Sequence, residues 1–177
     1  VDMLFGLNKP NEGTIAMKGD NIIGLNQRQL REKHISLVPE DRMLFGIAAN
    51  ASIEENIISD RADSKKMNKG LMFNMKNMHE ETDALIKEYK VLCKSRDQKV
   101  GMLSGGNIQK VVVAREFSNQ PDLIIADQPT RGIDVGAKYE IYDLIIKMAK
   151  MGKTIIVCSS EMPEILGITN RIGVMSN

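Results

Sequence analysis

Two short apolar runs with a helical pattern between them constrain the fold of this sequence more than any other feature. Residues 123–126 and the centre of 154–159 are apolar at successive positions, and apolar residues recur at helical spacing over 137–151. A helix over 107–118 precedes these runs and a strand over 171–175 follows them. Strands that are apolar on both faces are typical of parallel sheets covered by helices on each side. The sequence therefore predicts an α/β fold with a mostly parallel sheet.

The first part of the chain predicts a smaller α/β segment. Residues 1–7 show an apolar helical pattern, and residues 14–22 are typical of a strand and turn. Residues 28–42 predict a polar helix leading into a strand that ends near Pro39.

The middle of the chain differs from both ends. Residues 51–94 are rich in helix formers, Met and Lys, without strand alternation. Ser52 and Glu55 have the spacing of a capping box, which predicts the start of a helix. Near the end of the chain, a short helix is expected after Pro163. The middle segment therefore predicts a helical insertion between two α/β parts.

The overall composition excludes several classes of protein. The chain has 177 residues, of which 42% are hydrophobic and 27% charged, and a formal net charge of +1, so we expect a soluble globular protein with no broad basic face for nucleic acid. No apolar stretch approaches the roughly 20 residues of a membrane-spanning helix. Cys93 and Cys158 are far apart, and Cys158 lies in an apolar run. We therefore expect a buried reduced thiol and a cytoplasmic location.

The segment LSGGNIQK, residues 103–110, places a serine and two glycines directly before a predicted helix. Glycines let the backbone approach a ligand closely, and the unpaired amides at a helix start favour a phosphate. Taken alone, the SGG segment favours a plain helix cap with a flexible entry.

The apolar strand that follows this helix ends in Asp127 and Gln128. In a nucleotide-hydrolysing site, the residue after such an acid is usually a second carboxylate, so the amide is unexpected. The ordered combination of SGG, helix, strand and acid indicates a nucleotide site far more specifically than any of these parts alone.

In this order the motifs resemble those of the ATP-binding cassette (ABC) family, whose signature is LSGGQ and whose next landmark is a strand ending in Asp and Glu. The segments LSGGNIQKV, PTRGIDVGAKYEIYDLI, SSEMPEILGITNRIGVMSN and VPEDR are similar to one group within the family. They look like the second cassette of the tandem ATPase subunits of bacterial monosaccharide importers, especially of the galactose and methyl galactoside type. The resemblance covers residues 1–47 and 97–177 well and the helical middle loosely.

The resemblance implies a P-loop NTPase-like fold in two parts. Residues 1–47 and 119–177 would form a RecA-like core, and residues 48–118 a helical subdomain that ends with the signature and its helix. The P-loop pattern G-x-x-x-x-G-K-[ST] occurs nowhere in the sequence. We therefore expect an N-terminally truncated cassette, with its missing strand beside the strand that ends in Asp127.

The resemblance also implies an ATP site shared by two cassettes. The signature would clamp the terminal phosphate of an ATP held mainly by the other cassette, and Asp127 would help to hold Mg²⁺. For Asp127, the alternative is an acid that caps the turn after the strand. The expected signature residues are Leu103, Ser104, Gly105, Gly106 and Asn107.

Two further acids match landmarks of the family. Asp134, in RGID, corresponds to the loop through which paired cassettes sense each other, and Glu40 to the Q-loop that leads to the membrane permease subunits. Each has a local alternative, because Asp is common in Gly-containing turns and Glu40 follows Pro39 in a predicted turn.

Gln128 and Ser160 occupy the positions at which the family places its catalytic side chains. Gln128 stands where a Glu activates the attacking water, and Ser160, or its neighbour Ser159, stands where a switch His is usual. Gln has the shape of Glu but cannot accept a proton. We therefore expect ATP binding with weak or no hydrolysis, whether Gln128 is natural or introduced.

The function implied is an ATP-binding subunit of a monosaccharide importer at the cytoplasmic face of the membrane. Its expected partners are a second cassette, membrane permease subunits and, indirectly, a sugar-binding protein. A second hypothesis is a non-catalytic regulatory module that only donates its signature face to another cassette. The near-neutral charge disfavours a nucleic-acid partner.

Overall fold

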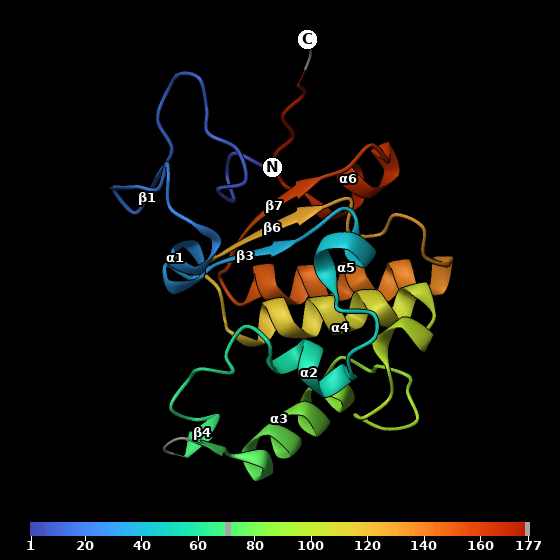
Figure 1. The fold of residues 1–177 in the computed structure, drawn as a ribbon. Helices are drawn as coiled ribbons and strands as arrows, with labels where there is room; N and C mark the ends of the chain where they lie inside the picture. Colours follow the sequence, from blue (N-terminus) through green and yellow to red (C-terminus); the bar gives the residue numbers. More distant parts are fainter. Residues whose placement is uncertain (70–71, 176–177) are drawn as a thin grey trace.

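Three parallel strands form the central sheet of the protein. The computed structural model describes residues 1–69 and 72–175. Within them β3 (Ile35–Val38), β6 (Leu123–Asp127) and β7 (Thr154–Cys158) pair in the order β3-β6-β7 (Figure 1). The predicted parallel sheet is confirmed. Because both sides of β6 are paired, the expectation of a missing strand beside it is wrong.

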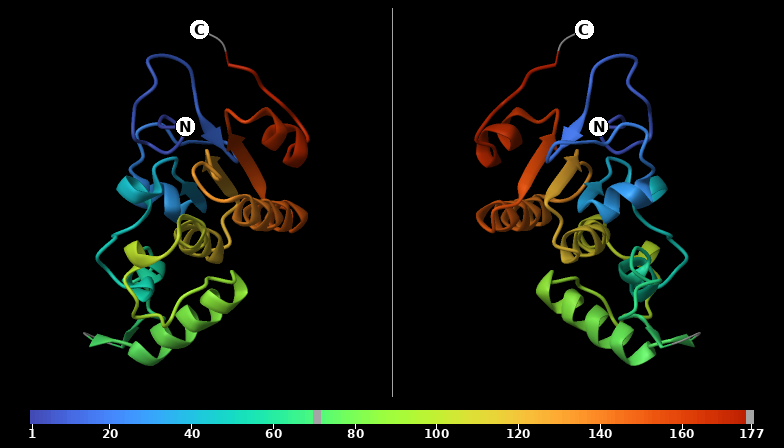
Figure 2. Two further views of the ribbon diagram at one scale, coloured as in Figure 1. Left: turned by 90° about the vertical axis from the view of Figure 1, so that its right-hand side faces the viewer. Right: turned by 90° about the vertical axis from the view of Figure 1, so that its left-hand side faces the viewer.

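Helices cover one face of this sheet in two layers. α4 (Gly105–Ser118) and α5 (Val135–Lys150) lie side by side below the strands, and α2 (Ile53–Ile58) and α3 (Met75–Glu88) lie beneath α4 (Figure 2). Every residue from 108 to 117 is buried, because α4 lies between the sheet and the lower helices.

Two hydrophobic clusters fill the two faces of the sheet. The larger cluster, on the side of α4 and α5, includes Ile124 and Ile141, and the smaller one, on the opposite face, includes Ile125 and Leu30 of α1 (Gln27–Glu32). Neighbouring residues of β6 enter opposite clusters because strand side chains alternate between faces. Burial on both faces is the physical reason for the unbroken apolar run in the sequence.

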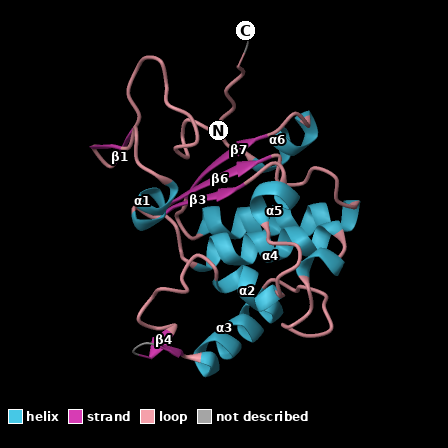
Figure 3. Ribbon diagram, in the orientation of Figure 1, coloured by secondary structure: helices cyan, strands magenta, loops and turns pink. Residues whose placement is uncertain are grey.

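The remaining elements are short. β1 (Ala16–Met17) pairs antiparallel with β2 (Asp20–Asn21), β4 (Asn68–Lys69) pairs with β5 (Met72–Phe73), and α6 (Met162–Ile168) follows β7. Figure 3 shows the longer helices gathered beneath the sheet and extended loops above it. Among the described residues, no helix has the length and apolar character needed to cross a membrane.

Two expectations fail at the ends of the chain. Residues 1–7 form turns, and Gly6 adopts a left-handed φ of 69° that is incompatible with a continuing helix. Residues 171–175 pair with no strand in the described parts of the chain, and Val174 is 85% exposed. A strand exists only through its hydrogen-bonded neighbour, so an apolar pattern alone does not create one.

Other local expectations hold, with small shifts. The capping box of Ser52 and Glu55 is present at the start of α2. The helix predicted over 107–118 begins two residues earlier because Ser104 caps it. Cys93 and Cys158 are free thiols, but both are half-buried instead of buried. The division of the chain at residues 47 and 118 stays a prediction.

Candidate functional site

The predicted site residues form two groups in the structure. The strand-end group lies where β3, β6 and β7 end, and the helix-mouth group lies where α4 and α5 begin. The strand-end group consists of Glu40, Asp127, Gln128 and Ser160. The helix-mouth group consists of Leu103, Ser104, Gly105, Gly106, Asn107 and Asp134. Residues 128–134 join the two groups in the chain.

Gln128 and Ser160 are brought together at the strand ends. The Gln128 Oε1 accepts hydrogen bonds from the backbone N–H of Ser160 at 3.3 Å and from its hydroxyl at 3.4 Å. The Gln128 N–H donates to the carbonyl of Cys158 at 2.8 Å, and Gln128 has a left-handed φ of 46°. Because a backbone N–H can only donate, the amide oxygen faces Ser160 and the Nε2 donors remain for another partner. Neither side chain offers a base.

Asp127 is the last residue of β6 and is half-buried. Burial, and secondarily the negative charge of Glu40, raise the pKa of the Asp127 carboxyl above its ordinary value. A bound cation would relieve both effects. No group of three or more His, Cys, Asp or Glu within residues 1–69 and 72–175 could hold a metal ion by itself. Mg²⁺ commonly uses one or two carboxylates together with phosphate oxygens, so a single acid fits that mode of binding.

Glu40 is engaged by the turn that follows β6. Its carboxylate forms an ion pair with Arg131, in which both side chains are largely exposed. Such exposed pairs contribute little to stability. Glu40 therefore lies close to the strand ends, but its carboxylate is already paired with Arg131.

The signature serine caps α4. The Ser104 Oγ accepts from the backbone N–H of Asn107 at 3.4 Å and from its Nδ2 at 2.9 Å. The Asn107 Oδ1 in turn accepts from the N–H of Leu92 at 2.8 Å, which ties the signature to the segment after α3. Leu103 packs against the larger hydrophobic cluster. Ser104 remains exposed, so the cap and a ligand-binding role are compatible.

The signature glycines permit a close contact between the starts of α4 and α5. A Cβ added at Gly106 would lie 2.5 Å from the Cβ of Ala137 and 3.3 Å from the Oδ2 of Asp134. Asp134 caps α5 by accepting from the Ala137 N–H at 2.9 Å. Sequence reasoning assigned Gly106 to phosphate binding, and the structure adds a steric reason for glycine.

Arg42 contacts the turn before the helix-mouth group, although the sequence did not single it out. Its guanidinium donates to the carbonyl oxygens of Arg131 at 2.7 Å and Gly132 at 3.1 Å, just before the helix-mouth group. The only local signal was a charged residue at the end of VPEDR. A contact between residues 89 positions apart leaves no pattern in one sequence.

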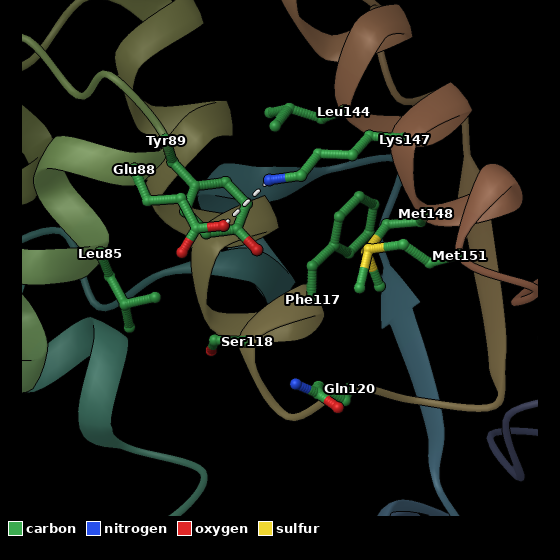
Figure 4. Close-up of a pocket in the computed structure, with 10 residues that line it drawn as sticks. All are labelled: Leu85, Glu88, Tyr89, Phe117, Ser118, Gln120, Leu144, Lys147, Met148 and Met151. Carbon is green, nitrogen blue, oxygen red and sulfur yellow. Dashed lines mark hydrogen bonds and ion pairs between the residues drawn. The ribbon is translucent and has the colours of Figure 1, made fainter.

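A small cavity of about 150 Å³ lies away from both groups (Figure 4). Tyr89, Phe117 and Met148 line it, and Lys147 forms an ion pair with Glu88 at 3.1 Å beside it. It is at the opposite ends of α4 and α5 from the signature, and no predicted site residue lines it. The residues predicted from the motifs therefore lie outside this cavity.

Comparisons with known proteins agree with these motifs. The family described as ABC transporter matches residues 1–131. The galactose/methyl galactoside import ATP-binding protein MglA of Treponema pallidum (strain Nichols) is 47% identical over 177 residues, which are 100% of this chain and 35% of that protein. The protein of the same name from Escherichia coli (strain K12) is 44% identical with the same coverage. The chain thus spans about a third of the length of these relatives.

Solved structures share the fold. A dimeric structure of a post-hydrolysis state of the ATP-binding cassette MJ0796, bound to ADP and Pi, has a TM-score of 0.74 at 24% identity, and the match covers 92% of this chain and 69% of that one. A nucleotide-free ATP-binding cassette from an ABC transporter has a TM-score of 0.71 at 20% identity, covering 94% of this chain and 67% of that one. At these identities, the likeness shows the fold.

Proposed function

The chain belongs to the ABC transporter family, and we propose that it is part of the ATP-binding subunit of a monosaccharide importer of the galactose and methyl galactoside type. The identity of 47% to a galactose/methyl galactoside import protein extends over the whole chain, which supports this substrate class. We further propose that the chain corresponds to the second of two cassettes, because Glu40 and Ser160 replace the usual Gln and His.

One observation carries the proposed role in ATP binding. The starts of α4 and α5 meet at the contact between Gly106 and Ala137, and the Ser104 hydroxyl is exposed beside them. The first amides of a helix have no intrahelical partner, and the helix dipole favours an anion there. This mouth is suited to the terminal phosphate of an ATP molecule that a second cassette holds.

Asp127 would hold Mg²⁺ at the strand ends. When bound, the ion would offset the negative charge of the ATP phosphates. The half-buried carboxylate of Asp127 would supply one ligand. Burial and the negative charge of Glu40 raise the pKa of this carboxyl, and a bound cation would lower it.

Hydrolysis at the Gln128 position would be weak. The Gln128 amide is held by Ser160 and can orient a water molecule or donate to a phosphate oxygen, but it cannot take the proton that the attack releases. We propose that ATP bound here mainly holds the two cassettes together, and that the other site of the pair hydrolyses ATP faster.

The segment after β3 is suited to contact membrane permease subunits. Asp41 caps a π-helical turn, Arg42–Gly46, by accepting from the N–H groups of Met43 and Leu44 at 3.0 Å each. The side chains of Leu44 and Phe45 are 69% and 71% exposed. An apolar turn beside the nucleotide site would transmit closure of the cassettes to the permease at the cytoplasmic face of the membrane. A sugar-binding protein would contribute only indirectly.

A complete transporter reconstituted in lipid vesicles tests this function. Ser104→Arg places a bulky cation at the mouth of α4, and we expect ATP-driven uptake of galactose to be abolished. Asn170→Arg, which adds the same side chain at an exposed position after α6, should leave uptake unchanged. Full uptake by the Ser104→Arg variant would refute a role for this serine in the ATP site.

A regulatory module without ATP of its own is the second candidate, and Gln128 is the observation that favours it. Labelling of the complete protein with a photoreactive ATP analogue and Mg²⁺ separates the two. Labelling that Asp127→Ala reduces to that of the other cassette supports the importer cassette. Labelling that Asp127→Ala does not change supports the regulatory module.

A further inference from the structure

We propose that Arg42 is a positioning residue that fixes the start of α5 and, through it, the signature on α4. The Nη1 of Arg42 donates to the carbonyl of Arg131 at 2.7 Å and the Nη2 to the carbonyl of Gly132 at 3.1 Å. These two carbonyls belong to the turn that leads into Asp134, the cap of α5. The inference deepens the proposed function and rests on it.

The same guanidinium also lies against the signature. A Cβ added at Gly105 would lie 3.0 Å from the Nη2 of Arg42 and 3.3 Å from the carbonyl oxygen of Gly132. The space between the turn and the signature is therefore filled by the Arg42 fork. Three segments that are distant in sequence, at the ends of β3 and β6 and at the start of α4, meet at this one side chain.

The geometry requires the planar fork of arginine. Two successive carbonyls accept from two different nitrogens of one guanidinium, whereas a lysine ammonium is a single point that cannot reproduce this arrangement. The Nε of Arg42 is buried, and among the described residues it has no hydrogen-bond partner. The side chain therefore bears the penalty of one unpaired donor while it makes its two carbonyl contacts.

A second link runs between the same two segments. Glu40 pairs with the side chain of Arg131, whereas Arg42 holds the Arg131 backbone. The Glu40 pair is exposed and easily broken, whereas Arg42 is half-buried and makes two charge-assisted bonds. A displacement of the π-helical turn would therefore move the 131–132 turn chiefly through Arg42, and with it the helix-mouth group.

We call the hydrogen bonds of Arg42 to the carbonyls of Arg131 and Gly132 the Arg42 clamp. Amide hydrogen exchange on the full-length protein tests this clamp directly. In Arg42→Met and Arg42→Lys, we expect the amides of residues 131–137 to exchange about tenfold faster, as loss of a charge-assisted hydrogen bond implies, and those of β6 to keep their rates. Arg28→Met is the matched control, because the Arg28 side chain is 76% exposed and pairs with Asp63, not with the 131–132 turn. It should change the exchange rates neither of residues 131–137 nor of β6.

ATP hydrolysis by the complete transporter tests the consequence. Both Arg42 variants should lower kcat about tenfold while the KM for ATP stays within about twofold, because the loss concerns alignment of the signature in the closed pair. Arg42→Lys should not restore the rate, since charge without the fork is insufficient.

The outcomes distinguish the clamp from the proposed function. Unchanged exchange in residues 131–137 overturns the clamp, and so does faster exchange in β6 as well, which would show that Arg42 only supports the fold. Faster exchange in the turn with an unchanged kcat also overturns the positioning role. If the unaltered transporter neither binds nor hydrolyses ATP, the proposed function fails, and the positioning role in ATP hydrolysis fails with it, although the exchange rates still report whether the contact exists.

Discussion

The helix-mouth group and the strand-end group are held in different ways. At the helix mouths, Gly106 allows the backbone of α4 to pack on the side chain of Ala137, and Asp134 caps α5 by accepting from the Ala137 N–H at 2.9 Å. At the strand ends, Gln128 and Ser160 meet only through bonds of 3.3 and 3.4 Å, and Glu40 is held by an exposed ion pair. The first group is therefore part of the packing of the fold, whereas the second can change its chemistry with little effect on stability.

The largest effect expected from this difference is at Gly106. Gly106→Ala places a Cβ 2.5 Å from that of Ala137, and we expect the free energy of unfolding in urea to fall by about 2 kcal/mol. Gly167→Ala makes the same change where no atom lies within 4 Å, so it should be neutral or slightly stabilising. Ala137→Gly should restore the stability of Gly106→Ala. Equal losses at both glycines would contradict the steric role.

Gln128→Glu tests the other group. A carboxylate at this position can accept the proton of the attacking water, so ATP hydrolysis at this site should rise about tenfold, measured in a complete transporter whose other site is inactivated. This gain is below that of a usual general base because Ser160 offers no base beside it. The free energy of unfolding should change by less than about 0.5 kcal/mol. The control Gln128→Asn has no base and should leave hydrolysis at or below its starting rate. A large loss of stability in Gln128→Glu would show that the two groups are held alike.

The cap of α5 provides a smaller effect within the rigid group. Asp134→Ala removes the acceptor for the N–H of Ala137, and the free energy of unfolding should fall by about 1 kcal/mol. Asp143→Ala, at an exposed position of the same helix, should change it much less. If the two substitutions had equal effects in urea unfolding, Asp134 would not be acting as a cap.

The sequence was most informative where local chemistry decides the structure. Caps, apolar periodicity and the SGG segment correctly predicted the start of α2, the three strands of the sheet and the position of α4. Prediction from the sequence failed where the structure depends on a partner that is distant in the chain. Residues 171–175 have the composition of a strand without a neighbour to pair with, and the contacts of Arg42 join residues 89 and 90 positions apart.

The smallest expected effect concerns the charge of Asp127. Its pKa is raised in the folded protein by burial and by Glu40, so the folded state binds a proton more tightly than the unfolded state. Stability should therefore decrease as the pH rises from the ordinary value of 3.8 through the folded pKa, and then stay level.

Asp127→Asn removes this dependence and should stabilise the Mg²⁺-free protein at pH 7 by less than about 1 kcal/mol, because water screens a half-buried carboxyl. Urea unfolding at pH 7 and below pH 3.8 measures the difference, which should vanish at the lower pH. A variant that is less stable at pH 7 would mean that the carboxylate is already stabilised by its surroundings, and the strand-end group would then be as firmly built as the helix mouths.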